Sequence, residues 1–199
     1  SKALSCGADK VAINTAFIDN PDFISESSEK YGSSTIVVEI QTKKLFNGKY
    51  VSFCENGRRN TGLDPLEWAI FAANSGAGEI LITSIDKDGN GLGFDKEITE
   101  KISKKVSIPT IASGGAGNSN QIIELLEQTG VDAVGLSSIL HYSLTKKLIE
   151  EGLEFIENKE FNIVGEKYQT SKLEPLTINA LKKQIFNKGF DCRMDYQKI

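Results

Sequence analysis

The hydrophobic positions of this chain gather in short apolar runs that are separated by amphipathic stretches. Three runs repeat one order of residues, at positions 7–14, 76–83 and 130–137: a glycine and a small residue, a polar residue, an apolar run and a polar end. Two more apolar runs lie at positions 35–40 and 108–112. A glycine that ends a helix, followed by a short buried run, is typical of a strand in a parallel sheet. The pattern therefore predicts five buried strands.

Amphipathic stretches between these runs predict helices at residues 21–31, 65–75, 95–104 and 118–129. In the second of them Leu66, Ala69 and Ile70 lie at helical spacing, directly after a Pro65 that suits the first turn of a helix. Strands that alternate with helices predict an α/β protein with a parallel sheet. A (β/α)8 TIM barrel is built from such strand-helix units.

One connection of about 20 residues, 41–62, is much longer than usual for this class of fold. It contains Asn47-Gly48, and apolar residues lie on both sides of that dipeptide. An Asn-Gly pair between apolar runs is a strong signal for a β-hairpin. We expect a small ribbon that covers the active face of the sheet.

The chain changes character after His141-Tyr142. Residues 143–160 are charged and helix-forming, residues 161–175 are irregular, and residues 178–188 form an amphipathic stretch closed by Gly189. We expect an enlarged C-terminal tail, with an insertion at residues 143–180 before the last helix. The chain begins at Ser1, without Met, in what resembles the end of a helix. We therefore expect residues 1–199 to be a single partial barrel domain.

Composition excludes several classes of function. The 23 basic and 27 acidic residues give a formal charge of -4, which offers no general attraction to nucleic acid. Three widely spaced cysteines and a single histidine make a disulfide framework or a metal site unexpected. No apolar run is long enough to span a membrane. We expect a cytoplasmic protein that uses neither a metal nor another cofactor.

The most informative stretch is residues 108–117, where an apolar strand runs into Gly114, Gly115 and Gly117 and then into a helix that begins near Asn118. Glycines let the backbone approach an anion closely, and the first N–H groups of a helix have no partner inside it. The stretch predicts a cradle for phosphate. The alternative is that the glycines merely close a strand-to-helix turn.

Three more strand ends carry polar residues that would lie on the same face. Asn14 and Thr15 end one strand, and Ser137 and Ser138 end another. Asp88 precedes Gly89 after a third. In a (β/α)8 barrel the carboxyl ends of the strands form the active face, and the last strand loops often hold phosphate. Asp88 is a candidate acid, base or anchor for a substrate hydroxyl, although it could instead shape the loop through an Asx-turn.

Taken together, these motifs resemble the cyclase subunit of imidazole glycerol phosphate synthase. The resemblance covers about residues 2–142 and returns near residues 181–193. It implies a (β/α)8 TIM barrel, of which this chain would hold only the C-terminal five strand-helix units. The barrel of this family accepts ammonia from a glutaminase subunit. Such a barrel cleaves and cyclises a bisphosphorylated substrate, a phosphoribulosyl formimino aminoimidazole carboxamide ribonucleotide, in histidine biosynthesis. The motifs that carry the resemblance are Gly7 to Thr15, Asn60-Thr61-Gly62, Gly76 to Gly89, Ile111 to Gly117 and Ser138 to His141.

The resemblance also implies roles for single residues. Asn14 and Thr15 would bind one substrate phosphate. Lys10 and Glu79 match charged residues of the gate through which ammonia enters the barrel floor, and Asp9 matches a position that faces the glutaminase. The other phosphate would be surrounded by Asp88, Gly89, Gly114, Gly115, Ser137 and Ser138.

One departure from the family bears on the chemistry. The second catalytic aspartate of the family falls on Gln41 in this chain. An amide cannot exchange a proton near neutral pH, although it can hydrogen-bond a substrate. The aspartate that the family uses as its main acid/base would lie on one of three strands that precede Ser1.

Two alternatives therefore stay open. A paralogous barrel uses glutaminase-derived ammonia to form an acetamidino group on a nucleotide-linked sugar for surface polysaccharide. Gln41, residues 61–68 and the enlarged tail resemble that group. A second alternative is a non-catalytic barrel fragment that only binds phosphate.

Overall fold

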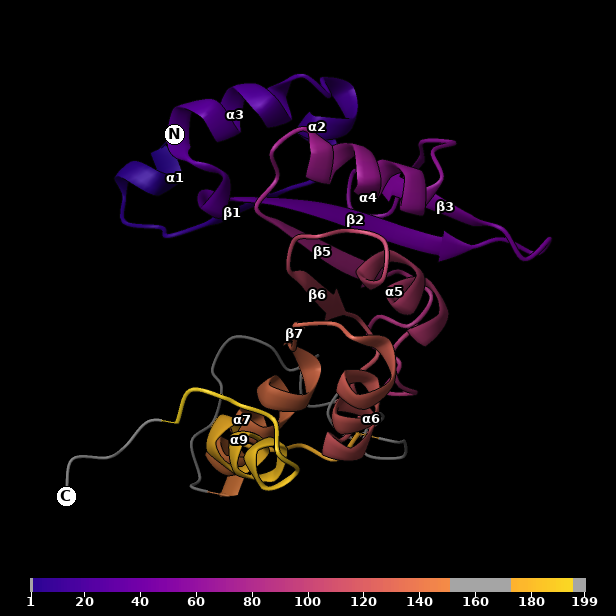
Figure 1. Cartoon of the computed structure of the whole chain (residues 1–199). Coiled ribbons are helices and arrows are strands. Elements are labelled where there is room, and N and C mark those ends of the chain that lie inside the picture. The colour runs from indigo at the N-terminus through magenta and orange to yellow at the C-terminus, as the bar shows by residue number, and fades with distance from the viewer. Residues whose placement is uncertain (1, 151–172, 195–199) are drawn as a thin grey trace.

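Five parallel strands form the centre of the computed structural model, which describes residues 2–150 and 173–194 (Figure 1). They lie side by side in the order β1-β2-β5-β6-β7. Their bounds are β1 Val11–Ile13, β2 Ile36–Lys44, β5 Glu79–Ser84, β6 Thr110–Ser113 and β7 Ala133–Gly135. The predicted parallel α/β fold, part of a barrel, is confirmed, and the sheet of the described residues is not closed into a ring.

The long connection forms the predicted hairpin. β3 (Tyr50–Cys54) pairs antiparallel with the second half of β2, and β4 (Arg59–Asn60) pairs with β3. β1 pairs with the first half of β2, from Ile36 to Val38, so one edge of β2 serves two neighbours in turn. The hairpin extends beyond the other strands (Figure 1).

Helices follow one another along the outside of the curved sheet (Figure 1). Asp64 begins one of them as a cap, because its carboxylate accepts from the N–H groups of Leu66 and Glu67. A 3-10 turn, η1, spans Ser33–Thr35. The helices are α1 Lys2–Ser5, α2 Thr15–Asp19, α3 Phe23–Tyr31, α4 Pro65–Asn74, α5 Lys96–Ser103, α6 Ser119–Thr129, α7 Ser138–Glu150 and α9 Ile178–Asn187.

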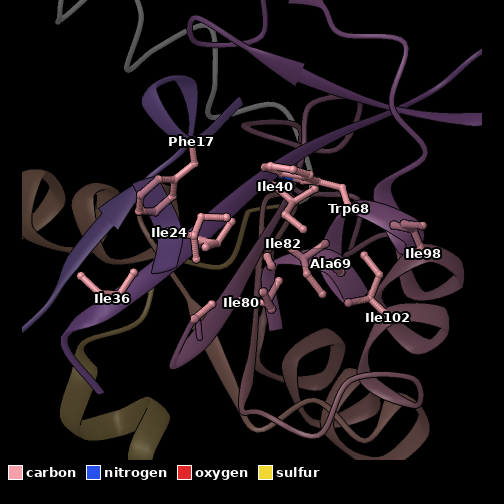
Figure 2. Close-up of a cluster of buried hydrophobic side chains, with 13 residues drawn as sticks. Phe17, Ile24, Ile36, Ile40, Trp68, Ala69, Ile80, Ile82, Ile98 and Ile102 are labelled. Atoms are coloured by element: carbon pink, nitrogen blue, oxygen red, sulfur yellow. The ribbon is translucent and has the colours of Figure 1, made fainter. Parts of the chain in front are cut away.

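The core lies between the helices and one face of the sheet. Ile36, Val38 and Ile40 alternate along β2 and pack with Ile80 and Ile82 of β5 (Figure 2). Helices α2, α3, α4 and α5 cover this cluster. A second cluster joins β6 to α6 and α9. Each fully buried isoleucine stabilises the fold by about 1.5–3 kcal/mol relative to an exposed one.

The other face of the sheet carries Glu39, Gln41, Thr83 and Ser113, because successive side chains alternate between the two faces. Gln41 of β2 pairs in register with Thr83 of β5, Thr83 with Ser113 of β6, and Ser113 with Gly135 of β7. We call these four residues the upper row. They lie at or near the carboxyl ends of the strands, where the predicted site lies.

The structure corrects four details of the predicted elements. Thr15 begins α2, a helix that was not predicted. The strand predicted to end at Ile40 continues to Lys44, because β5 pairs with it as far as Thr42 and β3 as far as Lys44. Ser137 and Ser138 belong to the start of α7, and that helix begins five residues before Ser143. The insertion predicted at residues 143–180 falls mostly on residues 151–172, outside the described residues, and stays a prediction.

Candidate functional site

A recess lies at the carboxyl ends of β5, β6 and β7. The three loops that follow these strands supply its walls, so segments far apart in the sequence meet there. The six residues that were predicted to surround one phosphate all line it. The lining consists of Asp88, Gly89, Ser113, Gly114, Gly115, Ala116, Gly135, Leu136, Ser137 and Ser138.

The glycines of the recess are required by the fold itself. Gly114 and Gly115 have φ of +91° and +104°, which side chains rarely allow. A Cβ on Gly115 would lie 2.3 Å from the carbonyl oxygen of Gly93, and one on Gly114 would lie 2.8 Å from that of Ser84. These two glycines therefore let the loop after β6 pack against the loop after β5. Their structural role and their predicted role in binding are compatible.

The start of α6 differs from the predicted cradle. The side chain of Asn118 accepts from the N–H of Gln121, and the side-chain oxygen of Gln121 accepts from the N–H groups of Gly117 (2.7 Å) and Asn118 (3.3 Å). This capping box already occupies the N–H groups of Gly117, Asn118 and Gln121, at the place where the cradle was predicted. An anion in the recess would therefore bind other backbone N–H groups.

The start of α7 offers such groups. The carbonyl of Ser137 accepts from the N–H of His141 (2.9 Å), so Ser137 is the residue that caps this 13-residue helix. The N–H of Ser138 lies in the first turn, where a helix supplies no acceptor, and the positive end of the helix dipole lies there too. The recess thus meets a helix N-terminus at Ser137 and Ser138, as expected of an anion site.

Asp88 and Asp86 have different surroundings in the loop after β5. One carboxylate oxygen of Asp86 accepts from the backbone N–H of Lys44 at 2.8 Å, so Asp86 ties this loop to the hairpin. Asp88 lines the recess, and its backbone N–H donates to Ser84 at 3.0 Å. Of the two, Asp88 is therefore the carboxylate that can meet a ligand.

The other predicted phosphate residues lie at the end of β1. Asn14 is buried, and its Nδ2 donates to the carbonyls of Glu39 and Phe53, both at 3.1 Å. The hydroxyl of Thr15 accepts from the N–H of Glu55 at 3.0 Å. These side chains hold the hairpin against β1, and the hairpin thereby contacts this end of the active face.

Gln41 lies in the upper row, where its Nε2 donates to Glu39 Oε1 at 3.3 Å. The same Glu39 oxygen accepts from the hydroxyl of Thr83 at 3.1 Å. Glu39 and Thr83 were not among the predicted site residues. The two-residue period of a strand carries the signal, because it places Glu39 on the same face as Gln41.

At the amino ends of the strands, away from the recess, Lys10 and Glu79 form an ion pair. Lys10 precedes β1 and Glu79 begins β5, so the pair spans the amino end of β2. Lys10 is 46% exposed and Glu79 19% exposed at the side chain. Asp9, beside Lys10, is exposed. The charged residues that were predicted to form a gate are thus in contact with each other.

A network that was not predicted joins the hairpin to α5. The hydroxyl of Tyr50 donates to the Asp95 carboxylate, at 2.9 Å to one oxygen, and lies 3.3 Å from a Glu97 oxygen. Lys44 and Lys101 bind Glu97 at 2.6 and 2.7 Å. Hydrogen bonds to these two lysines lower the pKa of Glu97 to about 2. Burial, followed by the hydrogen bond to Asp95, raises the pKa of Tyr50.

Two absences among the described residues bear on other classes of site. Within residues 2–150 and 173–194, no three His, Cys, Asp or Glu residues are grouped so that they could hold a metal ion. The same ranges contain no helix that is long and apolar enough to cross a membrane. The lone histidine, His141, forms an edge-on ring contact with Tyr142.

Parallel strand-helix units with polar groups gathered at the carboxyl ends of the strands define a protein of the (β/α)-barrel class, here with an open sheet. The chain belongs to the histidine biosynthesis protein family, whose model, described as "Histidine biosynthesis protein", matches residues 1–146.

Relatives of known name agree with this family. The chain is 49% identical over 139 residues to the imidazole glycerol phosphate synthase subunit HisF of Bacillus cereus strain AH187, across 70% of this chain and 55% of the relative. It is 46% identical over 157 residues to the protein of the same name from strain G9842, across 76% of this chain and 62% of the relative. The chain thus spans little more than half the length of the curated relatives it matches.

Proposed function

We propose that the chain is part of the cyclase subunit of imidazole glycerol phosphate synthase, an ammonia-accepting synthase of histidine biosynthesis. Its substrate would be the phosphoribulosyl formimino aminoimidazole carboxamide ribonucleotide. The single observation that carries the proposal is the recess. It brings together Asp88, the paired glycines and the start of α7, the set expected to surround one substrate phosphate. The names of the relatives support this choice of substrate.

The remaining residues take parts that agree with this proposal. Asn14 and Thr15 would meet the second phosphate at the far end of the same edge, mainly through the backbone that they hold in place. Lys10 and Glu79 would form the gate at the amino edge, with Asp9 facing a glutaminase subunit. Asp88 would orient a substrate hydroxyl or transfer a proton. The compartment expected for such an enzyme is the cytoplasm.

A second candidate function is favoured by Gln41. The amide at this position cannot act as a general acid or base near neutral pH. A barrel that uses ammonia to convert an acetamido group of a nucleotide-linked sugar to an acetamidino group is therefore the alternative. The third candidate function is that of a barrel that binds phosphate without catalysis.

A paired assay separates the three. The full-length protein is supplied with ammonium and, in turn, with the ribulosyl aminoimidazole substrate and with a nucleotide-linked acetamido sugar. We expect turnover of the first substrate only, and at least tenfold slower turnover by Asp88→Asn. Turnover of the sugar alone would replace the proposal by its alternative.

If neither substrate is turned over but inorganic phosphate binds, and binds more weakly to Ser138→Pro, which lacks the N–H at the start of α7, the chain is a phosphate-binding protein only. The exposed variant Asp22→Asn is the matched control for loss of a carboxylate away from the recess. It should keep the rate of the unaltered protein.

A further inference from the structure

One contact in the upper row is not used by the roles proposed above. Glu39 and Gln41 are two residues apart on β2 and so project from the same face of the sheet. Gln41 Nε2 donates to Glu39 Oε1 at 3.3 Å, and the hydroxyl of Thr83 donates to that same oxygen at 3.1 Å. The carboxylate is therefore held from two strands, and it in turn holds the amide.

The chemistry of the pair fixes which way the amide points. An ionised carboxylate only accepts hydrogen bonds, whereas a primary amide has a donor end and an acceptor end. The Nε2 end must face Glu39, so Oε1 faces away from it. Gln41 Oε1 is shielded from solvent and has no donor among the residues that the structure describes. A buried acceptor without a donor gains stability when a donor reaches it.

We propose that Glu39 is a positioning residue, which fixes the Gln41 amide so that its oxygen meets a hydrogen-bond donor of the ligand. The group bound at this point is thus an N–H or O–H group and not an anionic oxygen. Glu39 itself need not touch the ligand. The inference rests on the proposed function only for the identity of that ligand.

The same pair explains why an amide stands at position 41. A carboxylate there would face Glu39 with the same charge, and two carboxylates that share a site raise one of their pKa values strongly. In Gln41→Asp, the new carboxyl and Glu39 would therefore titrate as a coupled pair, and the new carboxyl would not be an independent general base. An aspartate at position 41 and the Glu39 carboxylate would therefore repel each other.

The first test needs no ligand and no turnover. The side-chain amides of the full-length protein are labelled with 15N-glutamine, and the Gln41 signals are assigned by their loss in Gln41→Met. We expect Glu39→Ala, which removes the acceptor of the Gln41 Nε2 hydrogen bond, to move the Gln41 signals. Glu79→Ala, which removes a carboxylate bound to Lys10, should leave them in place. Gln41 signals that stay in place in Glu39→Ala would overturn the inference.

The second test measures the pKa of the new carboxyl in Gln41→Asp by 13C shifts. We expect it to lie about one unit or more above the ordinary value and to return toward that value in Gln41→Asp/Glu39→Ala. Equal values in the two variants would contradict a role for Glu39. Both tests can succeed while the paired assay of turnover fails, so the inference and the proposed function are tested separately.

Discussion

The two ends of the proposed phosphate clamp are built in different ways. At the β1 end, the polar side chains are engaged by the protein, since Asn14 bonds two carbonyls and Thr15 accepts from Glu55. At the β6-β7 end, the recess is lined by glycines and by the start of α7. The first end uses side chains to hold backbone in place, and the second exposes backbone directly. Substitutions at Asn14 should therefore damage the fold, whereas those at Ser138 should damage binding.

The largest effect is expected where backbone itself lines the recess. A Cβ on Gly115 would overlap the Gly93 carbonyl, and the residue has a positive φ, so Gly115→Ala should lower the free energy of unfolding by about 3 kcal/mol. Gly89 also has a positive φ, but a Cβ added there would meet no atom within 4 Å, so Gly89→Ala should cost about 1 kcal/mol. Urea unfolding measures both. Equal costs would show that the two loops do not pack as described.

The comparison itself is tested by a pair of variants. Asn14→Ala removes the side-chain donor of the Glu39 and Phe53 carbonyls and should cost about 2 kcal/mol in unfolding free energy. Ser138→Pro removes the backbone N–H at the first position of α7, where proline is tolerated. It should change stability by less than about 1 kcal/mol but weaken binding of inorganic phosphate about tenfold. Calorimetry measures the unfolding and the phosphate binding of both variants. A stable Asn14→Ala together with an unfolded Ser138→Pro would reverse the assignment of the two ends.

Amide exchange gives a finer test of where an anion binds. Bound phosphate should slow exchange at Gly115, Ala116 and Ser138 in the recess. It should change Gly117 and Asn118 little, because Gln121 already occupies those two amides. Hydrogen exchange with and without saturating phosphate measures this. New protection confined to Gly117 and Asn118 would mean that the anion displaces the capping box.

The smallest effect concerns the contact between the hairpin and α5. Tyr50→Phe removes the hydrogen bond to Asp95 and should cost about 1 kcal/mol near neutral pH. The folded protein raises the pKa of Tyr50 above that of the unfolded chain, so this stabilisation is complete below about pH 10 and is lost as the pH rises further. Unfolding curves above pH 10 should fall more steeply for the unaltered protein than for Tyr50→Phe. Parallel curves would contradict the contact.

The order of strands and helices was predictable because it depends on local periodicity. The five apolar runs became β1, β2, β5, β6 and β7, and Asn47-Gly48 became the turn of the hairpin. Element ends were less predictable, because they depend on tertiary neighbours. β2 continues past Ile40 because β5 and β3 both pair with it there, and only β3 pairs with its last two residues. α2 is a short helix whose single buried residue, Phe17, gives little periodic signal.

The site was predictable as a set of residues but not as a set of contacts. Motifs placed Asp88, the paired glycines and Ser137-Ser138 at strand ends, and the recess brings them together. They could not show that the side-chain oxygen of Gln121 accepts from the N–H of Gly117 at the start of α6, because this hydrogen bond depends on the geometry of one turn. Nor could they show the bond from Gln41 to Glu39, which depends on the side-chain conformations of both residues.

One edge of β2 pairs with β1 along its first half and with β3 along its second half, and this arrangement affects the order in which the strand pairs form during folding. The pairing of Lys44 with Tyr50 closes a short turn, and hairpins form in about 1–10 μs. The parallel pairs join residues 25 and 42 positions apart, Val11 with Ile36 and Val37 with Glu79, and longer loops cost more entropy to close. Asn14 bonds both β2 and β3, so it can make its two bonds only after the hairpin exists. The β1 end of the active face is therefore completed late, as a strand that docks onto a hairpin already formed.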